Sequence, residues 1–200
     1  MRFINTALTG VAMLAMTSAL GAQSMDHGKS MSHGSMATGT VMVGGQTMYP
    51  NKDIVANAVN SADHTTLVAA VKAAGLVETL QSKGPFTVFA PTNAAFSGLP
   101  AGTVDGLLRP EAKGTLTKVL TYHVLSGNWD AKSIIKAIKK SGGSAELTTV
   151  SGGQLWATMN GPMNVVLKDA KGNWASISTY DVRQSNGVIH VIDRVLMPAM

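Results

Sequence analysis

The sequence predicts an α+β domain, with helices first along the chain and an antiparallel sheet after them. Between Ile54 and Leu120 apolar residues recur mostly at helical spacing. From Ala145 onward apolar and polar residues alternate with a period of two, and Gly-rich turns separate the segments. Helices followed by strands, instead of a regular alternation of the two, indicate the α+β class.

The first predicted elements are three short helices. Asp53 is placed to cap the first, and Ser61 or Asp63 to cap the second, which ends before Gly75. A third piece over 76–80 is broken by the Lys-Gly-Pro run at 83–85. The apolar positions expected to face the core are Ile54, Val55, Ala58, Val59, Leu67, Val68, Val71, Leu76, Val77 and Leu80.

A buried strand is predicted next, over Phe86–Ala90, because its residues are aromatic or β-branched and turn residues flank it. Pro91 is expected to end the strand. The helical segments that follow are expected to begin at Thr92 or Asn93, at Thr103, and at Pro110. The last of these helices carries Leu116, Val119 and Leu120 on one side.

The helix after Asp130 has the clearest amphipathic pattern in the chain. Isoleucines at 134, 135 and 138 are expected to face inward, and Lys132, Lys136, Lys139 and Lys140 line the other side. Five strands are predicted beyond it, over residues 146–150, 154–160, 164–168, 174–182 and 188–196.

Residues 1–22 are typical of a cleaved secretory signal. Arg2 precedes an apolar stretch over residues 4–20, and the small-residue run Ser18–Ala22 suits a cleavage site. The alternative is an uncleaved membrane anchor, for which the polar residues at 5, 6 and 9 make the stretch weak. The prediction is therefore an exported protein, secreted or periplasmic, without a transmembrane segment after cleavage.

Residues 23–48 are rich in Gly, Ser and Thr and are expected to form a flexible linker before a domain that spans 49–200. The linker contains a repeat in which Ser-Met-x-His-Gly occurs twice. Thioether and imidazole side chains are ligands for copper and silver ions, so the repeat has two interpretations, a spacer or a metal-binding tail. The candidate metal ligands are Met25, His27, Met31, His33 and Met36.

Composition excludes several classes of function. The net charge is +5, Arg2 contributes one of these charges, and the other basic residues are not interleaved with aromatics, so nucleic acid is not an expected partner. The chain has no cysteine, which excludes disulfides, a thiolate zinc site and a cysteine nucleophile.

Three segments together resemble the fasciclin, or FAS1, domain family. They are the run from Thr87 to Phe96, the Tyr122-His123 pair, and the run from Asn186 to Asp193. The resemblance covers nearly all of residues 49–200. It implies a compact wedge of mostly antiparallel strands flanked by short helices, and a cofactor-free role in adhesion at a cell surface or in an extracellular matrix, of the bacterial secreted single-domain type.

The resemblance also implies roles for particular residues. Tyr122 and His123 occupy the position implicated in receptor contact in animal members, and on a strand one of the two should reach solvent. The other signature residues are expected to be structural: Thr87, Phe89, Pro91, Thr92, Asn93, Phe96, Asn186, Gly187, His190 and Asp193. The expected partner is a surface protein or a polysaccharide, bound by a monomer.

Two further expectations concern charged and titratable side chains. The lysines at 132, 136, 139 and 140 form either an ordinary solvated helix face or a contact for an anionic polysaccharide or lipid headgroup. An enzyme built on His64, His123 and His190 is the alternative class, but the chain has no nucleophile elbow, metalloprotease motif or phosphate loop.

Overall fold

The computed structural model describes residues 39–199. The described part opens with a β-hairpin of strands β1 (Val41–Val43) and β2 (Gln46–Met48). Gly44 and Gly45 form its turn with φ angles of 57° and 73°, which favour glycine. Val43 and Met48 are buried, so the linker expected to reach residue 48 ends earlier, and the folded domain begins before Tyr49.

The helices α1 (Ile54–Ala58), α2 (Thr65–Ala74) and α3 (Val77–Gln81) follow in the predicted order. The Asp53 carboxylate accepts a hydrogen bond from the Ala56 N–H at 2.8 Å and caps α1 as expected. Neither Ser61 nor Asp63 caps α2, because a short 3₁₀ turn over Ala62–His64 places His64 at the start of the helix. Gly75 ends α2 in the left-handed conformation.

The middle of the chain contains strand β3 (Phe86–Pro91), helices α4 (Asn93–Ser97), α5 (Thr103–Leu107) and α6 (Lys113–Tyr122), and strand β4 (Val124–Ser126). The Thr92 hydroxyl caps α4 by accepting from the Ala95 N–H at 3.2 Å. Pro110 lies in a 3₁₀ turn directly before α6 and starts this helical segment.

The last part contains helix α7 (Ala131–Lys140) and five strands. The strands are β5 (Ser144–Thr148), β6 (Gln154–Met159), β7 (Val165–Lys168), β8 (Trp174–Gln184) and β9 (Gly187–Ile192). Each agrees with a predicted segment to within a few residues. Asp130 caps α7 by accepting from the Ser133 N–H at 2.8 Å, as predicted.

The main sheet of the described residues has the strand order β4-β3-β9-β8-β7-β6-β5. Its pairs are antiparallel except β3 with β9, which run parallel with Phe89 opposite His190. Beyond the end of β5 the chain returns to β4, where the Val150 N–H donates to the Val124 carbonyl at 2.8 Å. The sheet is therefore curled, and this mixed α+β architecture confirms the predicted fold class.

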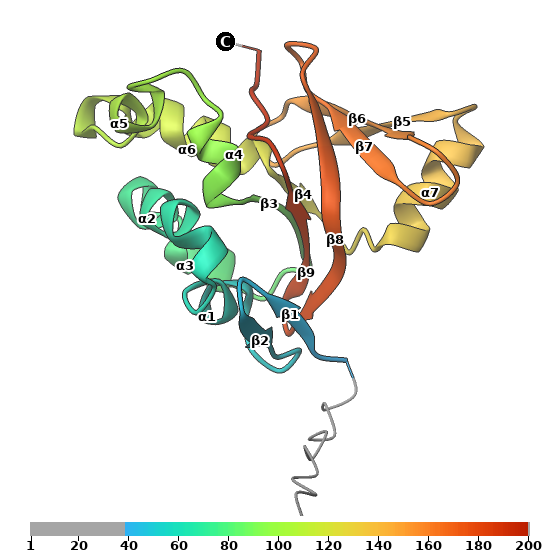
Figure 1. Cartoon of the computed structure of the whole chain (residues 1–200), viewed down its shortest axis with the longest axis horizontal. Coiled ribbons are helices and arrows are strands. Elements are labelled where there is room, and N and C mark those ends of the chain that lie inside the picture. Colours follow the sequence, from blue (N-terminus) through green and yellow to red (C-terminus); the bar gives the residue numbers. More distant parts are fainter. Residues whose placement is uncertain (1–38, 200) are drawn as a thin grey trace, which may run out of the picture. The chain divides into compact units, whose positions relative to one another are not determined.

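Two buried clusters share the strands β3 and β9. Figure 1 shows helices α1–α3 on one side of these strands and α7 on the other. The helix-side core packs α1–α4 and α6 against residues such as Val88 and Ile189. The α7-side core packs Ile134 and Ile138 against the inner face of β5–β8. Because β3 contributes Val88 to one core and Phe89 to the other, it is buried on both faces, which explains its continuous apolar sequence.

Candidate functional site

Tyr122 and His123 are both buried, with 0% and 2% of their surface exposed. Helix α6 ends at Tyr122, so neither residue lies on a strand. The expectation that one of them reaches solvent is therefore wrong, because it assumed the alternating geometry of a strand. Tyr122 enters the α7-side core, whereas His123 lines a pocket on the helix side.

Hydrogen bonds account for every polar atom of these two side chains. The Tyr122 hydroxyl donates to the Gln154 carbonyl at 2.5 Å and accepts from the Ala170 N–H at 3.0 Å. The His123 Nε2 accepts from the Leu196 N–H at 2.9 Å, so the ring proton is on Nδ1, which donates to the Val119 carbonyl at 2.8 Å. The pair holds α6 against β6 and the C-terminal segment, and offers no atom to a partner.

Burial also determines the charge state of the pair. It lowers the pKa of His123 to about 4, although the hydrogen bond to the Val119 carbonyl and the charge of Asp169 act in the opposite direction. Burial likewise raises the pKa of the Tyr122 hydroxyl. Both side chains are therefore neutral near pH 7.

His190 is a fully buried framework group on β9. Its Nε2–H donates to the Trp129 carbonyl at 2.8 Å, and its Nδ1 accepts a long hydrogen bond of 3.4 Å from the Asp181 N–H. Its ring stacks on Phe89 and meets the Tyr180 ring edge-on, with centroid distances of 5.7 and 6.0 Å. Burial lowers the pKa of His190, so the ring is held neutral.

Thr87 and Asp181 hold the loop that leads into α7. The Thr87 hydroxyl donates to the Gly127 carbonyl and accepts from the Trp129 N–H, both at 2.8 Å. The Asp181 carboxylate accepts from the Ala131 N–H at 2.8 Å, in addition to the Asp130 cap. Hydrogen bonds from Ser133 lower the pKa of Asp130. The start of α7 is thus fixed by side chains from β3 and β8.

The remaining signature residues connect elements that are distant in the sequence. Asn186 accepts from the Ile54 N–H at 3.1 Å and donates to the carbonyls of Leu80 and Ser82, which ties α1 and α3 to the turn before β9. Asn93 likewise accepts from the N–H of Thr66 in the first turn of α2 and donates to the carbonyl of Ala62 in the 3₁₀ turn before it. Asp193 accepts from the Ser176 N–H at 2.7 Å.

The apolar and glycine signature positions have steric roles. Phe89, Pro91 and Phe96 are buried. Gly187 lies so close to β3 that a Cβ atom there would be 2.0 Å from the Phe86 carbonyl oxygen, which no side chain could tolerate. Together with Thr92, which caps α4, these residues form framework. Asp193 is the exposed member of the signature set, and its carboxylate accepts the hydrogen bond from Ser176.

The four lysines of α7 are the predicted binding residues that the structure does expose. Lys132, Lys136, Lys139 and Lys140 all lie on the solvent side, while Ile134 and Ile138 are at most 1% exposed. Lys139 and Lys140 lie in the last turn, where the partial negative charge of the helix end favours cations. Figure 1 shows α7 across the central strands from helices α1–α3.

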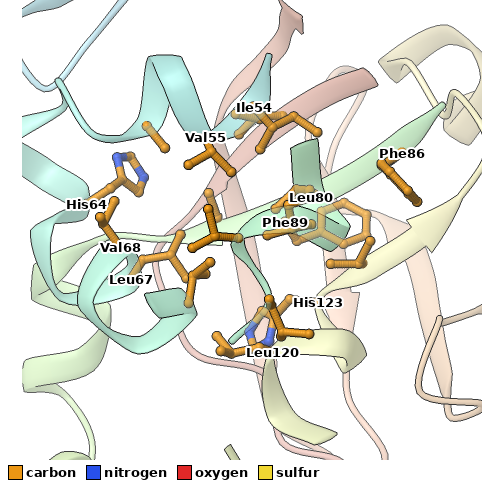
Figure 2. Close-up of a pocket in the computed structure, with 18 of the residues that line it drawn as sticks. Ile54, Val55, His64, Leu67, Val68, Leu80, Phe86, Phe89, Leu120 and His123 are labelled. Carbon is orange, nitrogen blue, oxygen red and sulfur yellow. The ribbon is translucent and has the colours of Figure 1, made fainter. Parts of the chain in front are cut away.

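A pocket of about 80 Å³ lies between the helices α1–α3 and strand β3 (Figure 2). Its lining is mainly aliphatic, and His64 and His123 are on its wall. Ligand pockets usually have volumes of about 300–1,000 Å³, so this one is too small for a cofactor or a drug-sized molecule. It is a gap in the helix-side core.

His64 and Ser61 form a buried pair beside this pocket. The Ser61 hydroxyl and His64 Nδ1 are 2.8 Å apart, while Nε2 makes no hydrogen bond of good geometry. Burial lowers the pKa of His64, and the Ala90 carbonyl opposes this only in part. Ser61 is 2% exposed beneath the hairpin turn, where a Cβ on Gly44 would lie 2.4 Å from its hydroxyl oxygen.

The predicted metal ligands Met25, His27, Met31, His33 and Met36 lie outside the described residues. Within residues 39–199, no three His, Asp or Glu side chains come together in a way that could hold a metal ion. In the same part of the chain, none of the helices combines the length and the apolar character needed to cross a bilayer.

Sequence reasoning missed two aspartates that the fold depends on. Asp169 is 1% exposed, and its carboxylate accepts four hydrogen bonds, from the N–H groups of Lys171, Asn173 and Met197 and from the Asn173 amide. Asp181 occupies a bulge of β8 at a φ of 53°. The turn around Asp169 was visible in the sequence, but the contact with Met197 was not.

A curled sheet with one internal parallel pair, packed on short helices, defines the class of FAS1-fold proteins. A solved FAS1 domain pair from the insect cell adhesion molecule fasciclin I superimposes with a TM-score of 0.65 and 19% identity, over 74% of this chain and 51% of that chain. This likeness shows the fold.

The sequence comparisons then identify the family. The fasciclin domain profile matches residues 62–198. Protein sll1483 from Synechocystis is 47% identical over 148 residues, or 74% of each chain. The cell surface glycolipoprotein MPB83 from Mycobacterium bovis is 37% identical over 62% of this chain and 48% of its own. The protein belongs to the fasciclin domain family.

Proposed function

We propose that this protein acts outside the cytoplasm as a non-catalytic adhesion domain, which binds an anionic surface through the exposed lysines of α7. One observation carries the proposal. The signature side chains pack in the cores or form hydrogen bonds within the domain. In contrast, four ammonium groups lie on the solvent side of a single ten-residue helix.

The geometry of α7 supports this role. Two isoleucines bury the opposite side of the helix, and Asp130 and Asp181 fix its first turn, so the lysines project from a rigid element. Exposed cations near an anionic surface each contribute on the order of 1 kcal/mol, and salt screens them. The name of the relative MPB83, a cell surface glycolipoprotein, agrees with a role at a cell surface.

The test is binding of the folded domain to immobilised dextran sulfate and to vesicles containing anionic lipid, at several salt concentrations. Replacing the four lysines of α7 by glutamine should weaken binding at least tenfold, with a shallower salt dependence. A variant with the same net charge, in which Lys72, Lys83, Lys113 and Lys118 become glutamine, is the control. Equal losses in the two variants would show that only net charge matters and would contradict the proposal.

The proposal assigns no catalytic step to the Ser61–His64 pair. A nucleophile must reach its substrate, and the hairpin turn covers Ser61. If a broad hydrolase screen detected turnover that Ser61→Ala or His64→Ala abolished, this part of the proposal would be wrong.

The repeat in residues 23–48 favours a second function, capture of copper or silver ions by thioether and imidazole ligands. Changing Met25, Met31 and Met36 to leucine should abolish Cu(I) uptake measured against a competing chelator. Met163→Leu is the control, because Met163 is 74% exposed and lies in the folded domain. Unchanged uptake in the triple variant would contradict metal capture and favour the interpretation of the segment as a spacer.

A further inference from the structure

The outer face of strands β5–β8 carries a row of side chains that nothing in the described structure covers. In the strand register Glu146 lies opposite Trp156, Trp156 opposite Lys168, and Lys168 opposite Trp174. The residues next to them along the strands point inward to the α7-side core, among them Leu155, Leu167 and Ala175. The row is therefore on the solvent side of the sheet, on the face opposite to α7.

The two tryptophans flank a lysine and border a shallow hollow. Trp174 is 47% exposed, Trp156 is partly exposed, and the Lys168 ammonium lies 5.5 Å from the centroid of the Trp174 ring. The hollow has a volume of about 530 Å³, within the range of small-molecule sites. Besides these residues its lining includes Ser144, Thr158, Lys171 and Gly172.

The lining of the hollow carries two lysines and one aspartate, which gives it a formal charge of +1. Asp169 is part of the lining, but its carboxylate is turned inward and satisfied by four hydrogen bonds. Within residues 39–199 neither Lys168 nor Lys171 forms an ion pair. Glu146 lies at the edge strand, where it accepts a hydrogen bond from the Gln154 amide. An anionic ligand therefore suits this face better than a cationic one.

We infer that this face, the tryptophan face of Trp156, Lys168, Lys171 and Trp174, binds an acidic polysaccharide that carries carboxylate groups. The apolar C–H side of a sugar ring packs on an indole face, while the ammonium groups bind carboxylates and the hydroxyls of Ser144 and Thr158 bind ring substituents. The two tryptophans are two strands apart, about 10 Å, which is close to the length of a disaccharide unit.

A polysaccharide fits these observations better than a protein partner. Protein interfaces usually centre on apolar side chains that lose all contact with water. Here hydroxyl and ammonium groups lie beside the two indoles around a hollow that is open to solvent. The inference goes beyond the proposed function, since it adds a second site and a ligand class on a different face from the α7 lysines.

Tryptophan fluorescence provides a direct test, with the full mature protein and trigalacturonate as the probe. Titration should change the emission intensity saturably. Trp174→Ala and Lys168→Gln should each raise the dissociation constant about tenfold, and Trp174→Tyr should restore most of the affinity, since it keeps an aromatic face. Circular dichroism and thermal unfolding check that each variant is folded.

A matched control exists at the other end of the domain. Lys52 lies over the ring of Tyr49 with its ammonium 5.0 Å from the ring centroid, and Tyr49 is 42% exposed. Tyr49→Ala and Lys52→Gln should leave trigalacturonate affinity unchanged. A neutral trisaccharide, cellotriose, should bind at least about tenfold more weakly than trigalacturonate, because it lacks the carboxylates.

The outcomes separate this inference from the proposed function. The α7 variant should lose dextran sulfate binding yet keep its affinity for trigalacturonate, and Trp174→Ala should do the reverse. Three results would each overturn the inference: absence of saturable binding, equal affinity for cellotriose, or unchanged affinity in a folded Trp174→Ala protein.

Discussion

Buried neutral histidines tie the stability of this domain to pH at the scale of single residues. His123 is 2% exposed, and its folded-state pKa of about 4 lies well below the ordinary value of 6.5. Between these two values the unfolded chain binds more protons than the folded one, so stability rises with pH across this window. The contribution of neutral His123 to stability is lost progressively as the pH falls from about 6.5 towards 4. Burial lowers the pKa of His64 and His190 in the same direction.

We predict that the free energy of unfolding in urea decreases from pH 7 to pH 4.5 at constant ionic strength. His123 alone contributes a loss on the order of 3 kcal/mol over its full window. His123→Gln keeps one donor and one acceptor but replaces the buried ring and does not titrate. The variant should therefore be less stable than the parent at pH 7 and show a shallower pH dependence. A variant with the parent's slope would show that His123 does not titrate as the structure indicates.

At the scale of secondary structure elements, α7 depends on a residue of β8. Asp181 has a φ of 53°, in the left-handed region that Asn and Asp tolerate better than other non-glycine residues. Its carboxylate accepts a hydrogen bond from the Ala131 N–H. The N–H groups in the first turn of a helix have no partner within the helix, so this bond satisfies one of them. A β-bulge therefore positions the helix that presents the four lysines.

We predict that Asp181→Ala lowers the free energy of unfolding by about 2 kcal/mol. Alanine removes the acceptor for Ala131 and is strained at this φ. Asp181→Asn keeps the acceptor oxygen and the tolerance for the left-handed region, and it should lose less than half as much. Hydrogen exchange of the Ala131 amide should speed up in the alanine variant only; equal exchange in both variants would contradict this role.

At the scale of the whole domain, stability is divided between two cores that share β3 and β9. The α7-side core holds many side chains at 0–1% exposure, for example Ile134, Leu155 and Leu167. The helix-side core contains the pocket of about 80 Å³ (Figure 2). Voids of this kind reduce stability because the lining atoms lack contacts on one side. The helix side is therefore where added volume should stabilise the fold.

We predict that Val68→Ile, which adds one methylene toward the pocket, stabilises the protein by about 1 kcal/mol. For a domain of this size the melting temperature should rise by about 2–4 °C. Val166→Ile is the matched control on the partly exposed outer face of β7, and it should change the melting temperature by less than about 1 °C. A decrease for Val68→Ile would show that the pocket cannot accept the extra group.

The residues themselves explain which parts of the site were predictable. Asp130, Thr92 and the lysines of α7 were found because caps and amphipathic spacing are local patterns. Tyr122 and His123 were misplaced because a one-residue difference between helix end and strand start changes the direction of both side chains. The tryptophan face was not foreseen, because it depends on the register of three strands, β6, β7 and β8, and no local sequence pattern determines that register.

The sequence by itself determined the family, the α+β class, most helix and strand positions and the exposed lysines of α7. These follow from propensity, capping and periodicity, which act over a few residues. Only the tertiary structure decided that β3 pairs parallel with β9, that Tyr122 and His123 are buried, and that two tryptophans and a lysine share one open face. Those features arise from contacts between segments far apart in the chain, where packing and hydrogen bonding decide which of several locally acceptable arrangements forms.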